Sequence, residues 1–184
     1  MKTYTVITSF HQAGLELYGQ KMIDTFEQHW PDSVDLVVYA ENCNPVTTKN
    51  NVRVIDLLGA SKECKRFVKR HRDNPEAHGG LGPHNEHDWT QKKSFKWQAV
   101  RFCYKVFSVH HALNNIDSEW VIWLDADSCT HSPVSTEWLA RVCPQGVDFS
   151  YLGRTERYHS ECGWVGYNKL GNHAINFANS FADM

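Results

Sequence analysis

The chain has 184 residues, of which 41% are apolar and 22% are charged; this composition is typical of one globular domain and argues against intrinsic disorder. Its 19 Lys and Arg nearly balance its 21 Asp and Glu, and the formal charge of −2 predicts neither a nucleic-acid-binding protein nor a polybasic membrane anchor. No apolar run reaches the roughly 18 residues of a membrane span, and the N-terminal residues lack the pattern of a signal peptide.

The first predicted strand covers residues 3–9 (TYTVITS), which are rich in β-branched and aromatic side chains. A helix is predicted over 15–30, where apolar residues recur every three or four positions before a proline. Strands are then expected at 34–40 and 52–57, followed by a basic surface helix over 61–72.

Residues 74–90 are irregular and rich in glycine, which favours a functional loop such as a lid over a bound donor. The next helix is predicted over 95–113, with an apolar stripe formed by Phe95, Ala99, Phe102, Val106, Val109 and Leu113. Residues 120–124 (WVIWL) form a continuously apolar run that predicts a strand buried on both faces.

A short helix over 137–142, strands at 147–152 and 164–167, and a last helix over 173–184 complete the predicted elements. Strands that alternate with helices predict a single α/β domain over residues 1–184, with a mostly parallel central sheet flanked by helices. Ligands bind beyond the carboxyl ends of the strands in such sheets, so the residues that follow each strand are the candidates for chemistry.

Six widely spaced cysteines include no C-x-x-C pair and no zinc-finger spacing, and the chain has no N-glycosylation sequon. We therefore expect reduced cysteines and a cytoplasmic location. The 7 Trp, 7 Tyr and 9 Phe predict mainly core packing, with Trp89, Trp97 and Trp164 placed to stack on a sugar.

Two carboxylates separated by one residue, Asp125 and Asp127, follow the most apolar strand. Carboxylate oxygens near a sheet edge, without a soft ligand nearby, suit Mg²⁺ or Mn²⁺, and these ions usually also bind substrate phosphates. The alternative interpretation is a turn at the end of the strand, in which an Asp side chain caps the backbone.

Three further charged side chains are candidates for the same site. Arg101 and Lys105 lie four residues apart and off the predicted apolar stripe, so they are either solvated or face an anion. Glu161 precedes a Gly-x-x-Gly strand, where glycines permit close approach of a ligand. It is either a general base or sugar-binding group, or an ordinary loop carboxylate.

The chain resembles the GT-A-fold glycosyltransferases, which are nucleotide-diphosphosugar transferases with a Rossmann-like sheet and a D-x-D metal motif. The resemblance rests on five segments in order along the chain: TSFHQAGLELYGQKMIDTFEQHWP, RFCYKVFSV, VIWLDADSCTHSP, YLGR and ECGWVGYN. It implies a hexosyltransferase that depends on Mn²⁺ or Mg²⁺ and transfers a sugar from a nucleotide sugar, with a UDP-sugar as the expected donor, to an unidentified acceptor.

The resemblance also implies a role for each matching residue. In the D-x-D motif formed by Asp125, Ala126 and Asp127, Asp125 would lie near the donor ribose and metal, and Asp127 would be the direct metal ligand. Arg101 and Lys105 would face the diphosphate or the transferred sugar.

The nucleotide base and ribose would lie against the end of the first strand, at Thr8, Ser9 and Phe10. Tyr39 and Glu41, after the second strand, would lie beside the base.

The segment Glu161, Cys162 and Gly163 would lie against the donor sugar and acceptor. Glu161 is the candidate base if the reaction inverts the anomeric centre. Members of the family usually continue into a C-terminal region that supplies much of the acceptor site and a further metal ligand, often a histidine. Because the sequence stops at Met184, it is either a minimal enzyme or a fragment, and we expect water or His173 in that ligand's place.

Three other interpretations remain open. A haloacid-dehalogenase-type phosphatase also uses D-x-D after a buried strand, but it prefers Thr or Val where Cys129 stands, and its motif follows the first strand. A transferase fold shortened until it only binds a nucleotide sugar or carbohydrate is the second. In the third, a zinc ion is bound in the glycine-rich loop by His78, His84, His87 and Asp88.

Overall fold

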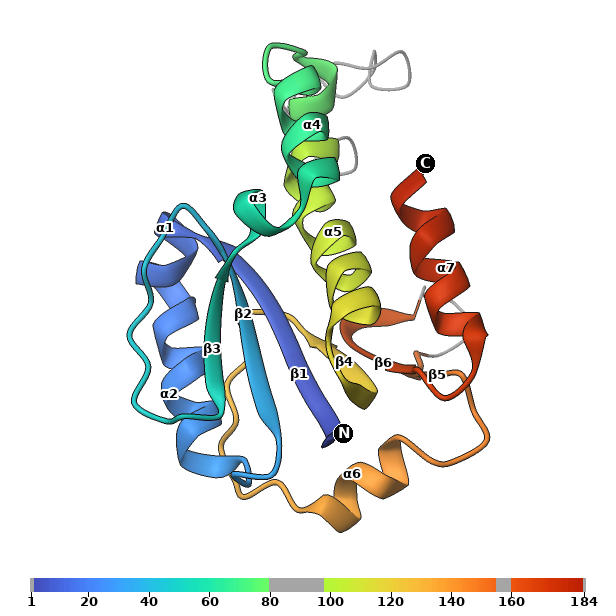
Figure 1. The fold of residues 1–184 in the computed structure, drawn as a ribbon. Helices are drawn as coiled ribbons and strands as arrows, with labels where there is room; N and C mark the ends of the chain where they lie inside the picture. The colour runs from blue at the N-terminus through green and yellow to red at the C-terminus, as the bar shows by residue number, and fades with distance from the viewer. Residues whose placement is uncertain (1, 80–97, 155–159, 184) are drawn as a thin grey trace.

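The computed structural model describes residues 2–79, 98–154 and 160–183, and these residues form a single α/β domain around one sheet (Figure 1). The strand order is β3-β2-β1-β4-β6-β5. The strands are β1 (Lys2–His11), β2 (Asp35–Glu41), β3 (Val52–Asp56), β4 (Ser118–Leu124), β5 (Phe149–Leu152) and β6 (Glu161–Asn168). Strands β3, β2, β1 and β4 are parallel to one another, whereas β6 is antiparallel to both β4 and β5.

Helices cover both faces of the sheet. They are α1 (Gln12–Gly14), the π-helical turn η1 (Leu15–Gly19), α2 (Gln20–His29), α3 (Leu57–Ala60), α4 (Lys62–His71), the 3₁₀ turn η2 (Glu76–His78), α5 (Ala99–Asn115), α6 (Thr136–Val142) and α7 (Asn172–Asp183). The predicted α/β domain, with a mostly parallel sheet flanked by helices, is confirmed. Each predicted strand and helix has a counterpart whose ends differ by a few residues.

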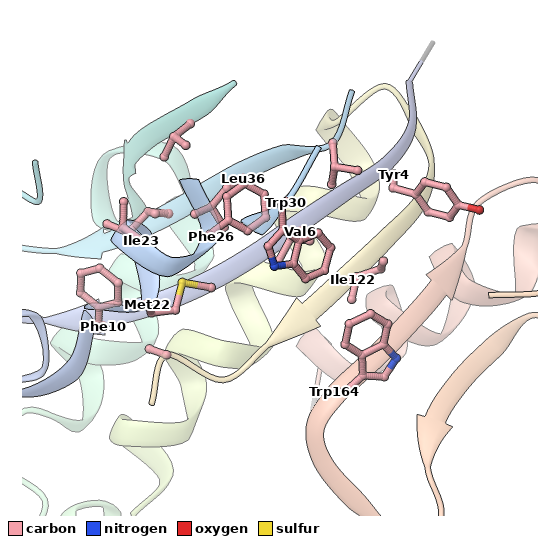
Figure 2. Packing of buried hydrophobic residues seen from close by; sticks show 14 of the residues in the cluster. Tyr4, Val6, Phe10, Met22, Ile23, Phe26, Trp30, Leu36, Ile122 and Trp164 are labelled. Atoms are coloured by element: carbon pink, nitrogen blue, oxygen red, sulfur yellow. The ribbon is translucent and has the colours of Figure 1, made fainter. Parts of the chain in front are cut away.

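Two hydrophobic cores hold the helices against the sheet. On one face, Met22, Ile23 and Phe26 of α2 pack against the side chains of β1, β2 and β4 (Figure 2). On the other face, α4, α5 and α7 pack against the alternate side chains of the same strands. Trp120 of β4 is 1% exposed, in agreement with a strand buried on both faces. Among the described residues, no helix is long and apolar enough to cross a membrane.

The buried face of α5 differs from the predicted stripe. Phe102 is 38% exposed and Ala99 is exposed, whereas Val100, Cys103 and Phe107 are buried. In the first half of α5 the buried stripe therefore lies one residue further along the chain, whereas Val109 and Leu113 of the predicted stripe are buried as expected. The reason is that α5 packs on the sheet while contacting α4 and α7, and both adjacent stripes are apolar enough to satisfy the periodicity.

Strand β6 begins three residues earlier than predicted, because Glu161, Cys162 and Gly163 are part of it. The two glycines of this strand have different roles. A side chain at Gly166 would lie 3.2 Å from the Trp120 ring, so this glycine permits close packing in the core. A side chain at Gly163 would lie 3.4 Å from a carboxylate oxygen of Asp125.

A buried leucine and an exposed leucine provide a matched pair of substitutions that tests the core packing. Leu36 is fully buried between β1 and β3, and Leu170 is 63% exposed. We expect Leu36→Ala to lower the free energy of unfolding by about 2–5 kcal/mol, because it leaves a cavity in the sheet core. Leu170→Ala should change it by less than about 0.5 kcal/mol in the same urea titration. Equal effects of the two substitutions would contradict this packing.

Candidate functional site

The parallel strands β1, β2 and β4 bring their carboxyl ends to one edge of the sheet, and antiparallel β6 begins at the same edge (Figure 1). The backbone N–H of Asp125 donates to the Gly163 carbonyl at 2.8 Å, which extends the pairing of β4 and β6 by one residue. This pairing places Asp125 beside Glu161 and Gly163, although about 36 residues separate them in the chain.

Asp125 is held in place by two donors. One carboxylate oxygen, Oδ1, accepts hydrogen bonds from Lys105 Nζ at 3.1 Å and from the indole N–H of Trp123 at 2.5 Å. Lys105 Nζ also donates to the Cys162 carbonyl at 2.7 Å and lies 4.7 Å from the centre of the Trp123 ring. Lys105, which we expected to be solvated or to face an anion, therefore forms an ion pair with a carboxylate of the protein itself.

Asp127 lies in a turn that a hydrogen bond from Ser128 N–H to the Asp125 carbonyl closes at 3.0 Å. The alternative interpretation of a turn at the strand end is thus correct for the backbone. The Asp127 side chain, however, is exposed and forms no hydrogen bond or ion pair with any described residue. Ala126 between the two aspartates is buried.

The two carboxylates fit a hard divalent cation. Asp125 keeps its second oxygen, Oδ2, on the side where Gly163 has no side chain, and Asp127 faces the same pocket. Mg²⁺ is usually bound by one or two protein carboxylates, with substrate phosphates and water as its other ligands. Within residues 2–79, 98–154 and 160–183, no group of three His, Cys, Asp or Glu side chains comes together as a metal site.

A pocket of about 600 Å³ lies at this edge. Its lining residues are Leu124, Asp125, Asp127, Ser128, Trp138, Val142, Ser150, Tyr151, Leu152, Glu161, Gly163 and Trp164. Trp138 and Tyr151 are 38% and 58% exposed, and sequence reasoning missed both. Their signal was weak, because an aromatic residue in a short helix or edge strand usually packs in the core. Trp164 also lines the pocket but is 7% exposed.

Glu161 projects from the first position of β6 into this pocket. Its Oε1 accepts hydrogen bonds from the N–H groups of Cys162 at 3.1 Å and Gly163 at 3.2 Å, and its Oε2 pairs with Arg154. These contacts fix the orientation of the carboxylate. A carboxylate has about four acceptor positions, so one remains for a substrate hydroxyl. Cys162 itself is exposed.

A second pocket of about 430 Å³ lies where β1 and β2 end, and its lining includes His11, Tyr18, Glu41, Arg101 and Tyr104. The Ser9 hydroxyl donates to the Glu41 carboxylate. Burial raises the pKa of Glu41 to about 7, against the hydrogen bond from Ser9 and the charge of Arg101, which lower it. A strongly perturbed carboxyl group in a pocket is typical of a functional site.

Three residues predicted to border the nucleotide are instead in the interior. Thr8 and Tyr39 are fully buried and Phe10 is 3% exposed. The Tyr39 hydroxyl hydrogen-bonds to Nδ1 of His111 at 2.9 Å, below the sheet edge. Helices cover both faces of the sheet, so both alternating sets of side chains on β1 and β2 are buried in a core. Ser9 and Glu41 are the predicted residues of this group that reach the pocket region.

The histidines considered as ligands have other contacts. His78 Nε2 hydrogen-bonds to the carbonyl of Arg72 at 2.8 Å, and His173 pairs with Asp148 at 3.0 Å. His84, His87 and Asp88, and with them most of the predicted lid, lie outside the described residues, as do Trp89 and Trp97.

No protein-family model matches the sequence, and neither does any curated protein. Solved structures do match over 98% of the chain. Mouse xyloside xylosyltransferase 1 in its apo form has a TM-score of 0.53 and 9% identity, and the match covers 71% of its chain. The apo structure of the bifunctional glycosyltransferase WbbM has a TM-score of 0.52 and 12% identity, with 33% of its chain covered. The chain therefore shares the fold of these two glycosyltransferases.

This fold agrees with the GT-A-like architecture that the sequence motifs suggested. At 9% and 12% identity the likeness concerns the fold alone. The chemistry must therefore be argued from this chain's own residues.

The raised pKa of Glu41 predicts that the stability of the protein depends on pH. Between its ordinary value of 4.5 and about 7, the folded chain keeps a proton on Glu41 that the unfolded chain has lost. The wild type should therefore lose stability relative to Glu41→Gln as the pH rises through this window. At pH 8 we expect the variant to be more stable by at most about 3 kcal/mol, and at pH 4 the difference should vanish. Urea titrations of both proteins at several pH values measure this difference, and a pH-independent difference would contradict it.

Proposed function

We propose that the chain transfers a sugar from a nucleotide-sugar donor to an acceptor hydroxyl. The observation that carries the proposal is the grouping of Asp125, Asp127 and Glu161 in one pocket at the carboxyl edge of a glycosyltransferase fold. Ligands bind at this edge in open α/β sheets. Several carboxylates there, on neighbouring strand ends, suit a substrate that has both phosphates and hydroxyl groups.

Helix α5 runs from the pocket beside Glu41 to the pocket beside Asp125 and contributes a cation to each region. Arg101 lines the pocket beside Glu41, and Lys105, one turn further along, contacts Asp125 beside the larger pocket. One turn of helix spans only about 5.4 Å, which is comparable to the length of a diphosphate. We infer that the nucleoside lies in the Glu41 pocket, the sugar lies in the Asp125 pocket, and the diphosphate crosses between them.

Charge explains how these residues promote the reaction. The bond between the anomeric carbon and the diphosphate oxygen breaks, and the leaving nucleoside diphosphate gains negative charge. A Mn²⁺ or Mg²⁺ ion, when bound, supplies positive charge to the diphosphate, and Asp125 and Asp127 would hold it. Arg101 adds a cationic group at the pocket where the nucleotide would lie.

Glu161 is the candidate base. In an inverting transfer, the acceptor oxygen forms the new bond to the anomeric carbon and its proton passes to a nearby base. The contacts of Glu161 with Arg154 and two backbone N–H groups hold its carboxylate in one orientation. The exposed rings of Trp138 and Tyr151 offer flat apolar surfaces beside it, which suit the apolar face of an acceptor sugar.

The donor proposal predicts a ligand-dependent thermal shift. We expect one of UDP-glucose, UDP-galactose, UDP-N-acetylglucosamine or UDP-xylose to raise the melting temperature by about 5–10 °C at a concentration 100-fold above its Kd, with Mn²⁺ or Mg²⁺ present. UDP-xylose is included because the mouse neighbour is named a xylosyltransferase. Asp127→Asn should abolish the shift, whereas Asp73→Asn, at an exposed position that lines neither pocket, should keep it.

If no nucleotide sugar, with either ion, changes the melting temperature, the proposal is wrong. Turnover then separates an enzyme from a protein that only binds the donor. An enzyme should slowly release UDP and free sugar without an acceptor, whereas a binding protein should release neither.

A second substitution tests the base. Glu161→Gln keeps the shape of the side chain but removes its ability to accept a proton. We expect the rate of transfer to fall by about 10²–10⁴, with donor binding retained. Glu76→Gln, at an exposed position, is the control. Unchanged transfer by Glu161→Gln would remove the base from the mechanism.

A further inference from the structure

Helix α4 and the residue that follows it carry a dense row of cations. Lys62, Lys65, Arg66, Lys69, Arg70 and Arg72 are all exposed. Glu63 is the one carboxylate within residues 62–72, so six cations and one carboxylate give this stretch a formal charge of +5. The whole chain has a charge of −2. The near-neutral total therefore conceals a strong segregation of charge.

The fold does not need these charges. The opposite face of α4 holds the helix in place, with Cys64 buried and Phe67 packed 6.1 Å from the Phe107 ring of α5. On the basic face, the pairs Lys62 and Arg66, and Lys65 and Lys69, have the four-residue spacing at which like charges destabilise a helix. An unfavourable arrangement of this kind is expected where an anionic partner compensates for it.

Little within the described part of the chain neutralises this row of cations. Among the described residues, Glu63 is the only carboxylate that forms an ion pair with it, through Arg66 at 3.2 Å, and this pair is exposed. Four of the cations line a shallow groove of about 450 Å³, namely Lys62, Lys65, Arg66 and Lys69. Helix α4 and the adjoining end of α5 extend past the sheet (Figure 1).

We propose that the basic face of α4 binds an anionic lipid bilayer. Clusters of four to eight Lys and Arg on a helix are typical of surfaces that bind acidic lipid headgroups. The exposed residues of α4 include no aromatic ring on which a base could stack, which disfavours a single-stranded nucleic acid. They also include no apolar side chain to insert into the bilayer, so the contact is electrostatic and reversible by salt.

The position of α4 determines where a bound bilayer would lie relative to the candidate site. Helices α3 and α4 follow directly from the carboxyl end of β3, at the same edge of the sheet as the candidate site. Helix α4 also packs on α5, which carries Arg101 and Lys105. A bilayer bound to α4 would therefore lie near the sheet edge at which the candidate site is built. The inference does not depend on the proposed sugar transfer.

Co-sedimentation with vesicles tests the proposal. We expect the protein to bind vesicles of phosphatidylcholine with 30% phosphatidylglycerol at about 0.1 M NaCl, to leave them at about 0.5 M NaCl, and not to bind phosphatidylcholine alone. K65E/K69E should weaken binding at least a hundredfold, because it changes four charges at the surface. K21E/R141E, which makes the same change of charge at exposed positions on α2 and α6, should bind nearly as well as the wild type.

Three results would overturn the proposal: no binding to the anionic vesicles, equal binding by K65E/K69E, or equal loss in K21E/R141E. Tighter binding to a 20-base-pair duplex than to the vesicles would assign the surface to nucleic acid instead. Both variants change exposed side chains, so thermal unfolding should show that they fold. K65E/K69E should melt within a few degrees of the wild type, because both positions are exposed and the formal charge of residues 62–72 falls only from +5 to +1.

Discussion

The ammonium group of Lys105 lies between the Asp125 carboxylate at 3.1 Å and the Cys162 carbonyl at 2.7 Å, and so connects three elements of the candidate site. It joins α5 to the end of β4 and to the start of β6. A half-buried carboxylate near a sheet edge is costly without a partner, and the ammonium together with the Trp123 N–H satisfies it. Lys105 therefore positions Asp125 before any substrate arrives.

The same contacts direct the rest of the pocket. With Oδ1 of Asp125 held by its two donors, Oδ2 is left toward Gly163, where the absence of a side chain keeps the space open. Antiparallel β6 is necessary for this arrangement, because only a strand that begins at the carboxyl edge of the sheet can bring Glu161 to the pocket. Because β6 runs opposite to β4, the first residues of β6 lie at the same edge of the sheet as the residues that follow β4.

The sequence predicted the order and type of the elements well, and burial less well. Periodicity identified α2 and β4, and the D-x-D motif was correctly placed after a buried strand. Periodicity could not choose between the two apolar stripes of α5, because that choice depends on contacts with α4 and α7. A resemblance between sequences assigns roles to positions but not to side-chain directions, and so it placed the buried Tyr39 beside the nucleotide.

The aromatic residues also show that the sequence does not reveal which side chains are exposed. Trp30, Trp164 and Trp138 form a continuous row, with ring centres 6.5 Å and 5.6 Å apart, that runs from the core to the pocket. Only the last ring of this row has a substantially exposed surface, at 38%. The buried members fix the position of the exposed one through ring packing, so Trp138 can present its face without losing orientation when a ligand leaves. The high aromatic content of the chain therefore serves core and pocket together, and only the packing shows which ring faces the pocket.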